Sequence, residues 1–157
     1  MLKMTIHKFA ALLLSTLGLL MLHTTTAQGS TSAVGEDVSA KAAGCVGTSW
    51  SGTLGNQKAI CNGNYLVRMQ GNGDLVLRVI SSGRACWHSN TAGAWSNDAY
   101  AVFNKNIWGK PYVDVVKDSQ GRLKRLVGWH TPTTFGTNAS VNYKGEFWIG
   151  YRKVAYC

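Results

Sequence analysis

The chain has 157 residues, carries 16 Lys and Arg against 7 Asp and Glu, and has a formal net charge of +9. A basic surface can suit nucleic acid, an anionic membrane or an acidic polysaccharide. The basic residues are scattered, however, and only residues 122–125 form a cluster. The charge pattern therefore argues against a nucleic-acid-binding protein.

The N-terminal segment has the layout of an export signal. A basic start with two lysines precedes an apolar run over residues 9–22, and small residues at 25–27 offer a cleavage site, with 31–33 as a second choice. This order is typical of a secretory signal peptide. The apolar run is shorter than the roughly 20 residues that span a bilayer. We therefore expect a signal peptide over residues 1–27, a secreted protein and no membrane span.

The mature chain divides into a leader and a single domain. Cleavage after residue 27 leaves 130 residues (157 minus 27), a length that suits one domain. Residues 28–44 are rich in Ser, Ala and Gly, as flexible leaders are. With the two signal-peptide lysines removed, 14 basic residues face 7 acidic ones, a net charge of +7. The folded domain is expected over residues 45–157.

Four cysteines lie in the exported part. An even number in an oxidising compartment predicts two disulfides, with three possible pairings. Closing the longest loop stabilises most in the chain-entropy picture, which favours Cys45–Cys157 together with Cys61–Cys86. A zinc site needs paired ligands at short spacing, such as Cys-x-x-Cys, and the sequence has none. We expect no metal and no cofactor.

After residue 44 the apolar residues come in short alternating runs, separated by turns rich in Gly and Asn. This pattern is typical of strands in an all-β domain, and nothing beyond the signal segment has helical periodicity. Asn-Gly between alternating runs is a strong hairpin signal. The clearest runs are residues 65–69, 75–80, 112–116 and 147–151.

One unit is repeated three times at a spacing of 36 residues. In each copy a glycine follows a side-chain amide by three residues: Gln70 and Gly73, Asn106 and Gly109, Asn142 and Gly145. A fixed period of this length indicates a copied supersecondary unit. Three such units can share one core around a pseudo-threefold axis, and the aromatic residue that closes each unit should lie near that axis. The predicted buried residues are Leu66, Leu75, Leu77, Trp87, Val113, Val115, Trp129, Phe147 and Ile149.

Residues 64–77 and 86–93 resemble the bulb-type (monocot mannose-binding) lectins. That family carries three copies of a Gln-x-Asp-x-Asn-x-Val-x-Tyr sugar motif. The resemblance implies an all-β fold, the β-prism II with three pseudo-symmetric antiparallel sheets. It also implies a carbohydrate-binding function without catalysis.

The first copy matches the motif best. Residues two apart in a strand share one face, so the candidate carbohydrate-binding residues share one side: Gln70, Asn72, Asp74, Val76 and Arg78. The Asp and Asn positions are exchanged relative to the family, and Arg78 stands where the family has Tyr. Because an Arg fork matches carboxylates and phosphates, the ligand is predicted to be mannose or an altered, acidic glycan.

The second and third copies keep little of the motif beyond the leading amide. For Asn106 and Asn142 we favour a role in holding the turn over contact with sugar, whereas for Gln70 the two interpretations are balanced. The residues at the remaining motif positions are Trp108, Lys110, Tyr112 and Asp114 in copy two, and Lys144, Glu146, Trp148 and Gly150 in copy three.

Two alternatives to a lectin remain. His88, His130 and Glu146 would suit the proton transfers of a small basic nuclease, but their matched Trp-His context is better explained by duplication, and no other catalytic motif appears. We therefore predict that the protein is not an enzyme. The stronger alternative is a secreted interaction or toxin-like protein that reuses the lectin fold without binding sugar. A single weak site would favour a homo-oligomer.

Overall fold

A computed structural model describes residues 44–157 of the chain, which belong to one compact unit. The predicted signal peptide and residues 28–43 of the predicted leader lie outside the described residues. Within residues 44–157 the secondary structure is all-β, with no helix. Accordingly, this part of the chain contains no helix with the length and apolarity needed to cross a membrane.

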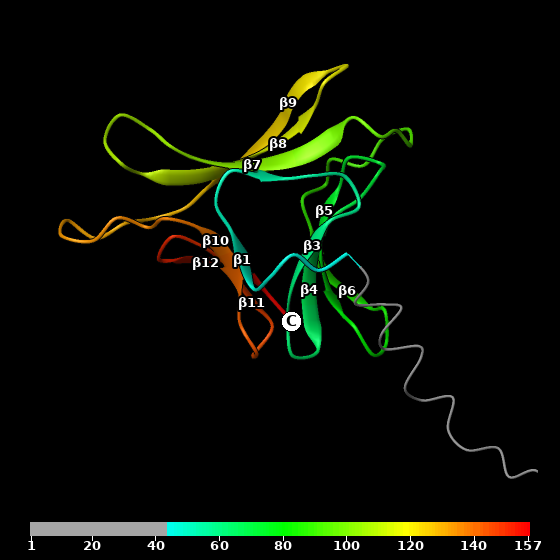
Figure 1. Ribbon diagram of the computed structural model, residues 1–157, viewed down its shortest axis with the longest axis horizontal. Coiled ribbons are helices and arrows are strands. Elements are labelled where there is room, and N and C mark those ends of the chain that lie inside the picture. Colours follow the sequence, from blue (N-terminus) through cyan, green and yellow to red (C-terminus); the bar gives the residue numbers. More distant parts are fainter. Residues whose placement is uncertain (1–43) are drawn as a thin grey trace, which may run out of the picture. The chain divides into compact units, whose positions relative to one another are not determined.

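Twelve strands of the described residues form three antiparallel sheets of four strands each. Figure 1 shows how these strands are arranged in space. This is the β-prism II architecture that the resemblance implied, so the predicted fold class is confirmed. Sheet I contains β3 (Ala59–Asn62), β4 (Tyr65–Met69), β5 (Leu75–Val79) and β6 (Ala85–His88). Sheet II contains β2 (Thr53–Leu54), β7 (Ala99–Lys105), β8 (Pro111–Lys117) and β9 (Gly121–Val127). Sheet III contains β1 (Ser49–Trp50), β10 (Ala139–Val141), β11 (Glu146–Ile149) and β12 (Arg152–Tyr156).

The short strands β1 and β2 complete sheets that are built far away in the sequence. In β1, Ser49 pairs with Ser140 of β10, and in β2, Thr53 pairs with Val102 of β7. Each repeat thus supplies three strands of its own sheet, and the segment before the first repeat supplies the fourth strand of every sheet: β3 for sheet I, β2 for sheet II and β1 for sheet III. This segment ties all three repeats together.

The feature that recurs every 36 residues is a hairpin turn of one geometry. Each turn joins the second and third strands of a sheet, and the glycine N–H donates a hydrogen bond to the carbonyl of the amide residue. These bonds measure 3.0, 2.9 and 3.0 Å at Gly73, Gly109 and Gly145. The three glycines have φ angles of 88°, 74° and 76°. Because side chains disfavour this region of φ, the turn requires glycine at the same place in each copy.

The core lies between the three sheets and is built from alternate residues of their middle strands. Six predicted core residues are fully buried there, two from each copy: Leu75, Leu77, Val113, Val115, Phe147 and Ile149. Leu66 is also buried, but it belongs to a separate small cluster with Ala59 and Ile80. The alternation of apolar residues thus predicted the buried strand positions correctly.

The closing aromatic residues are less buried than predicted, and of the three only Trp87 packs against the core. Trp87 is half-buried and packs against Phe147, which also stacks on Trp50, with 5.9 Å between ring centroids in each pair. Trp129, however, is 50% exposed, so its predicted burial is wrong. The reason is the length of the β8–β9 hairpin. Leu126 lies opposite Val113 and packs on the core, while Trp129 falls beyond the end of β9. The third closing aromatic, Tyr156, is exposed as well.

The preferred disulfide pairing is also wrong. The structure pairs Cys45 with Cys61 and Cys86 with Cys157, and no described cysteine is free. Cys45 forms a parallel bridge with Ala59, which places it beside β3. Cys157 follows β12, which packs against β6 of sheet I. Loop-closure entropy concerns the unfolded chain, whereas the distance between cysteines in the folded chain decides which bonds can form.

Candidate functional site

The five candidate residues of copy one lie on the β4–β5 turn and along β5. Leu75 and Leu77 point into the core, and Asp74, Val76 and Arg78 occupy the alternate positions of the strand. Gln70, Asn72 and Arg78 are half-buried, while Asp74 and Val76 are buried at 5% and 2% exposure. The hairpin thus brings the five together on one stretch of backbone but leaves only three within reach of solvent.

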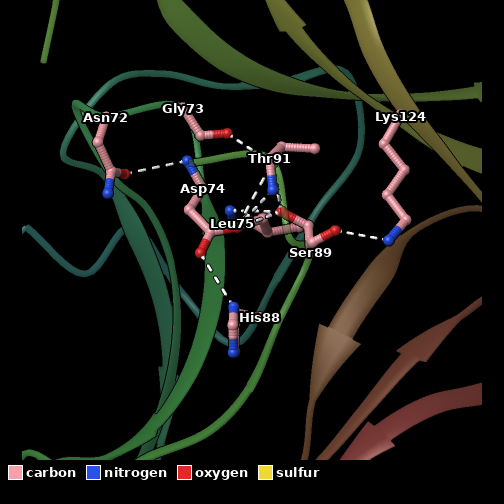
Figure 2. Close-up of polar contacts among 8 residues, drawn as sticks. All are labelled: Asn72, Gly73, Asp74, Leu75, His88, Ser89, Thr91 and Lys124. Atoms are coloured by element: carbon pink, nitrogen blue, oxygen red, sulfur yellow. Dashed lines mark hydrogen bonds and ion pairs between the residues drawn. The ribbon is translucent and has the colours of Figure 1, made fainter. Parts of the chain in front are cut away.

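Asp74 anchors the segment that follows β6, as Figure 2 shows. Its Oδ1 accepts hydrogen bonds from the Ser89 hydroxyl at 2.7 Å and from the Thr91 backbone N–H at 3.1 Å. Its Oδ2 lies 3.4 Å from Nδ1 of His88. The Thr91 hydroxyl donates in turn to the Gly73 carbonyl at 2.7 Å. The buried carboxylate therefore holds the turn and the segment after β6 in one arrangement.

The segment after β6 also lies along the turn itself. Gly93 N–H donates to the Asn72 carbonyl, and Ser96 N–H donates to the Gly71 carbonyl, both at 2.7 Å. A side chain on Gly71 would meet the ring of Trp95 at 2.6 Å, so this close approach requires glycine. Residues 89–96 therefore form one wall beside the candidate site, which the sequence did not predict.

Val76 and Arg78 lie further along β5. In the strand register Val76 stands between Arg68 and His88, and its burial leaves little apolar surface for a sugar to contact. Nη1 of Arg78 donates to the Gly83 carbonyl at 2.9 Å, which holds the guanidinium near the β5–β6 turn. His88 is the exposed neighbour that sequence reasoning did not include in the site. The pairing of β6 with β5, which places His88 opposite Val76, is the feature that could have identified it.

The amides of copies two and three hold their turns. Oδ1 of Asn106 accepts the N–H groups of Trp108 at 3.0 Å and Lys110 at 2.9 Å. Oδ1 of Asn142 accepts the N–H groups of Lys144 and Glu146, both at 3.0 Å. The hydrogen bonds agree with the preferred turn-holding interpretation of both residues.

In copy one the turn is held by Asn72, two residues after the leading amide Gln70. Asn72 Oδ1 accepts the Asp74 N–H at 3.1 Å. In the part of the chain that the structure describes, the side-chain amide of Gln70 has no hydrogen-bond partner. Gln70 is therefore the leading amide that stays available to a ligand.

The acidic residues at motif positions of copies two and three, Asp114 and Glu146, both form ion pairs within the protein. Asp114 binds Arg125 through two hydrogen bonds of 2.7 Å, and the guanidinium lies 3.9 Å from the ring centre of Tyr112. The hydrogen bond to Asp114 raises the pKa of Arg125. Glu146 accepts from Lys153 at 2.8 Å and from Asn142 at 2.7 Å, and its pKa is lowered chiefly by the hydrogen bond from Lys153.

Comparison with known proteins finds likeness at the level of structure alone. No family model matches the sequence, and no curated protein matches it. A mannose-specific lectin from Dutch crocus (Crocus vernus) is 15% identical, with a TM-score of 0.49 over 68% of this chain and 91% of the lectin. The mannose-specific agglutinin from snowdrop (Galanthus nivalis) bulbs is 16% identical, with a TM-score of 0.45 over 67% of this chain and 87% of the agglutinin. A monomeric monocot mannose-binding lectin from Gastrodia elata is 16% identical, with a TM-score of 0.41 over 65% of this chain and 91% of that lectin.

The three residues considered for acid–base catalysis have separate partners. His88 lies beside Asp74, and Glu146 binds Lys153. Nδ1 of His130 lies 2.8 Å from the Thr131 carbonyl, and its ring packs on Phe135. Among residues 44–157, no group of three His, Cys, Asp or Glu is placed to hold a metal ion.

Proposed function

We propose that this protein is a secreted, non-enzymatic carbohydrate-binding protein that binds glycan on the outer face of copy one. Gln70, Asn72 and Arg78 would contact the ligand, while Asp74 and Val76 support them from below. The observation that carries the proposal is the Asp74 network. A buried carboxylate that binds Ser89, Thr91 and His88 orders the polar groups around it before any ligand arrives. Preorganisation of this kind lowers the entropy cost of binding.

The accessible groups match the hydroxyl groups of a sugar. The side-chain amide of Gln70 can both donate and accept hydrogen bonds. Asn72 can donate through Nδ2, because within the described chain only its Oδ1 forms a hydrogen bond. Asp74 and Arg78 are four residues apart, which corresponds to about 13 Å along a strand. A ligand that reaches from the turn to Arg78 is therefore an oligosaccharide that lies along β5. A carboxylate at its far end would suit the Arg78 guanidinium.

Secretion and the absence of catalysis are part of the same proposal. Two disulfides join the described cysteines, and such bonds persist mainly in oxidising compartments. The predicted signal peptide supports export independently. The separate partners of His88, His130 and Glu146 support a binding protein over a nuclease, since a catalytic pair must converge on one reacting atom.

The second candidate is a secreted interaction protein that uses the same fold without binding sugar. The observation that favours it is the internal use of the acidic motif positions. Asp114 binds Arg125, and Glu146 binds Lys153. An interaction protein would keep these contacts for stability while losing the affinity for glycans.

A glycan array on the mature protein separates the two candidates. Tagged protein would be displayed multivalently, because shallow single sites gain avidity through effective concentration. We expect wild-type binding to at least one glycan class, and loss of about tenfold or more in the Gln70→Ala/Arg78→Gln variant, as for one to two lost hydrogen bonds. The matched control is Arg84→Gln, an exposed residue of the β5–β6 turn, which should leave binding unchanged. No signal above background would favour the interaction protein, and equal signal in the double variant would exclude the copy-one face as the glycan site.

A further inference from the structure

A groove of about 440 Å³ lies where sheets II and III meet, well within the size range of ligand sites. It combines three aromatic side chains with three basic ones. The side chains that line it are Lys110, Trp129, Trp148, Tyr151, Arg152 and Lys153. None of them belongs to the copy-one face, so this groove and the proposed glycan site are separate features of the protein.

Backbone hydrogen bonds hold Trp129 against the β11–β12 turn. Its N–H donates to the Ile149 carbonyl at 3.3 Å, and its carbonyl accepts the Tyr151 N–H at 2.8 Å. Gly150 lies between these contacts with a φ of 56°, and a side chain there would meet the Trp129 carbonyl at 2.5 Å. The wall of the groove is therefore fixed by the backbone.

The aromatic side chains present accessible ring surface in the groove. Trp129 and Tyr151 are 50% and 45% exposed, and Trp148 is half-buried beside them. Large aromatic residues are normally more buried in a folded domain, and an exposed group of them marks a binding surface. Flat rings suit the apolar C–H faces of sugar rings, because those faces can stack without leaving a polar group unpaired.

The basic side chains of the groove exceed its acidic ones. Arg152 donates to the Val127 carbonyl at 3.2 Å, Lys153 binds Glu146, and Lys110 has no carboxylate partner among the described residues. Three cations against one carboxylate leave an excess charge of +2 at the groove. The aspartates of residues 44–157 have partners elsewhere: Asp74 with Ser89, Asp98 with Ser96, Asp114 with Arg125, and Asp118 with Tyr100.

We propose that this groove binds an anionic oligosaccharide. Its sugar rings stack on Trp129 and Trp148, and its carboxylate or sulfate group binds Arg152 and Lys110. The charge complements an acidic ligand, and the aromatic wall selects for sugar rings rather than for a free anion. A nucleic acid fits less well, because single strands are tracked by an extended basic groove that meets successive phosphates, whereas these cations gather in one short groove.

Fluorescence anisotropy with labelled oligosaccharides tests the proposal on the mature protein. The probes are an oligogalacturonate, which carries carboxylates, a heparin-derived oligosaccharide, which carries sulfates, a neutral oligomannose and an oligothymidylate. We expect binding of one or both anionic saccharides, weakened when NaCl rises from about 0.05 M to about 0.3 M, since salt screens exposed charges. The stronger of the two anionic probes identifies the anion. Equal binding of oligomannose, or tighter binding of oligothymidylate, would overturn the proposal.

Variants assign the binding to the groove. Trp129→Ala and Arg152→Gln should each weaken anionic binding by about fivefold to tenfold, equivalent to the loss of about 1–1.4 kcal/mol. Trp108→Ala removes a more exposed Trp outside the groove and should leave binding unchanged. Gln70→Ala/Arg78→Gln should also leave it unchanged, which separates this site from the copy-one face. Equal binding by Trp129→Ala and Arg152→Gln, with circular dichroism showing all variants folded, would exclude the groove.

Discussion

The hydroxyl of Ser89 donates a 2.7 Å hydrogen bond to Oδ1 of Asp74, and both side chains are buried. The same hydroxyl accepts the backbone N–H of Leu75 at 2.9 Å. This pair thus joins the start of β5 to the residue that follows β6, although the two residues are 15 positions apart in the chain. A motif position that the sequence assigned to ligand contact also stabilises sheet I.

Replacing Asp74 should destabilise the domain. Asp74→Ala leaves the Thr91 N–H and the Ser89 hydroxyl without their acceptor, and buried donors without partners cost about 1–3 kcal/mol. Urea denaturation monitored by Trp fluorescence measures the loss. The control is Gln120→Ala on an exposed turn, which should change stability by less than about 0.5 kcal/mol. Equal stability of Asp74→Ala and wild type would show that the network contributes nothing.

Substitutions at two turn glycines should distinguish the cost of backbone strain from the cost of a steric clash. Gly83 and Gly145 have φ angles of 68° and 76°, but only at Gly145 would an added Cβ meet a ring, that of Tyr65 at 2.7 Å. Gly83→Ala should therefore cost about 1–2 kcal/mol, the penalty of the left-handed conformation alone. Gly145→Ala should cost more because Tyr65 must move as well. Thermal and urea denaturation of both variants checks the order, which a smaller loss at Gly145 would contradict.

The two disulfides should differ in their contribution to stability. The loops span 16 residues for Cys45–Cys61 and 71 residues for Cys86–Cys157. Loop-closure entropy gives about 3 kcal/mol for the shorter loop and about 4.4 kcal/mol for the longer one. Denaturation of Cys45→Ser/Cys61→Ser and Cys86→Ser/Cys157→Ser tests this difference. Peptide mapping without reduction should find Cys45 linked to Cys61, and a Cys45–Cys157 peptide would contradict the structure.

The Glu146–Lys153 pair predicts a loss of stability in acid. The pKa of Glu146 is lowered in the folded chain, first by the hydrogen bond from Lys153. Its contribution is therefore fully present above the usual glutamate pKa of about 4.3 and is lost as the pH falls through the lower folded-state pKa. Wild type should thus exceed Glu146→Gln in stability near neutral pH, and the difference should shrink below about pH 4. A difference that is independent of pH would exclude the ion pair as its cause.

The sequence by itself determined the local features of the fold. The turns at Gly73, Gly109 and Gly145 follow from the need for glycine at positive φ, and the burial of Leu75 and Leu77 follows from the two-residue period of a strand. The same period placed Asp74, Val76 and Arg78 on one face of β5. These properties depend on neighbouring residues only, so they can be inferred without knowledge of the rest of the chain.

Only the tertiary structure decided which distant segments meet. The partners of Asp74 lie 15 and 17 residues further along the chain, so its burial did not follow from the motif. Trp129 is exposed because the length of one hairpin carries it past the core. The cysteines pair as they do because Cys45 returns to β3 and β12 packs beside β6. Such distances are set by the packing of whole sheets, and no local pattern of residues encodes them.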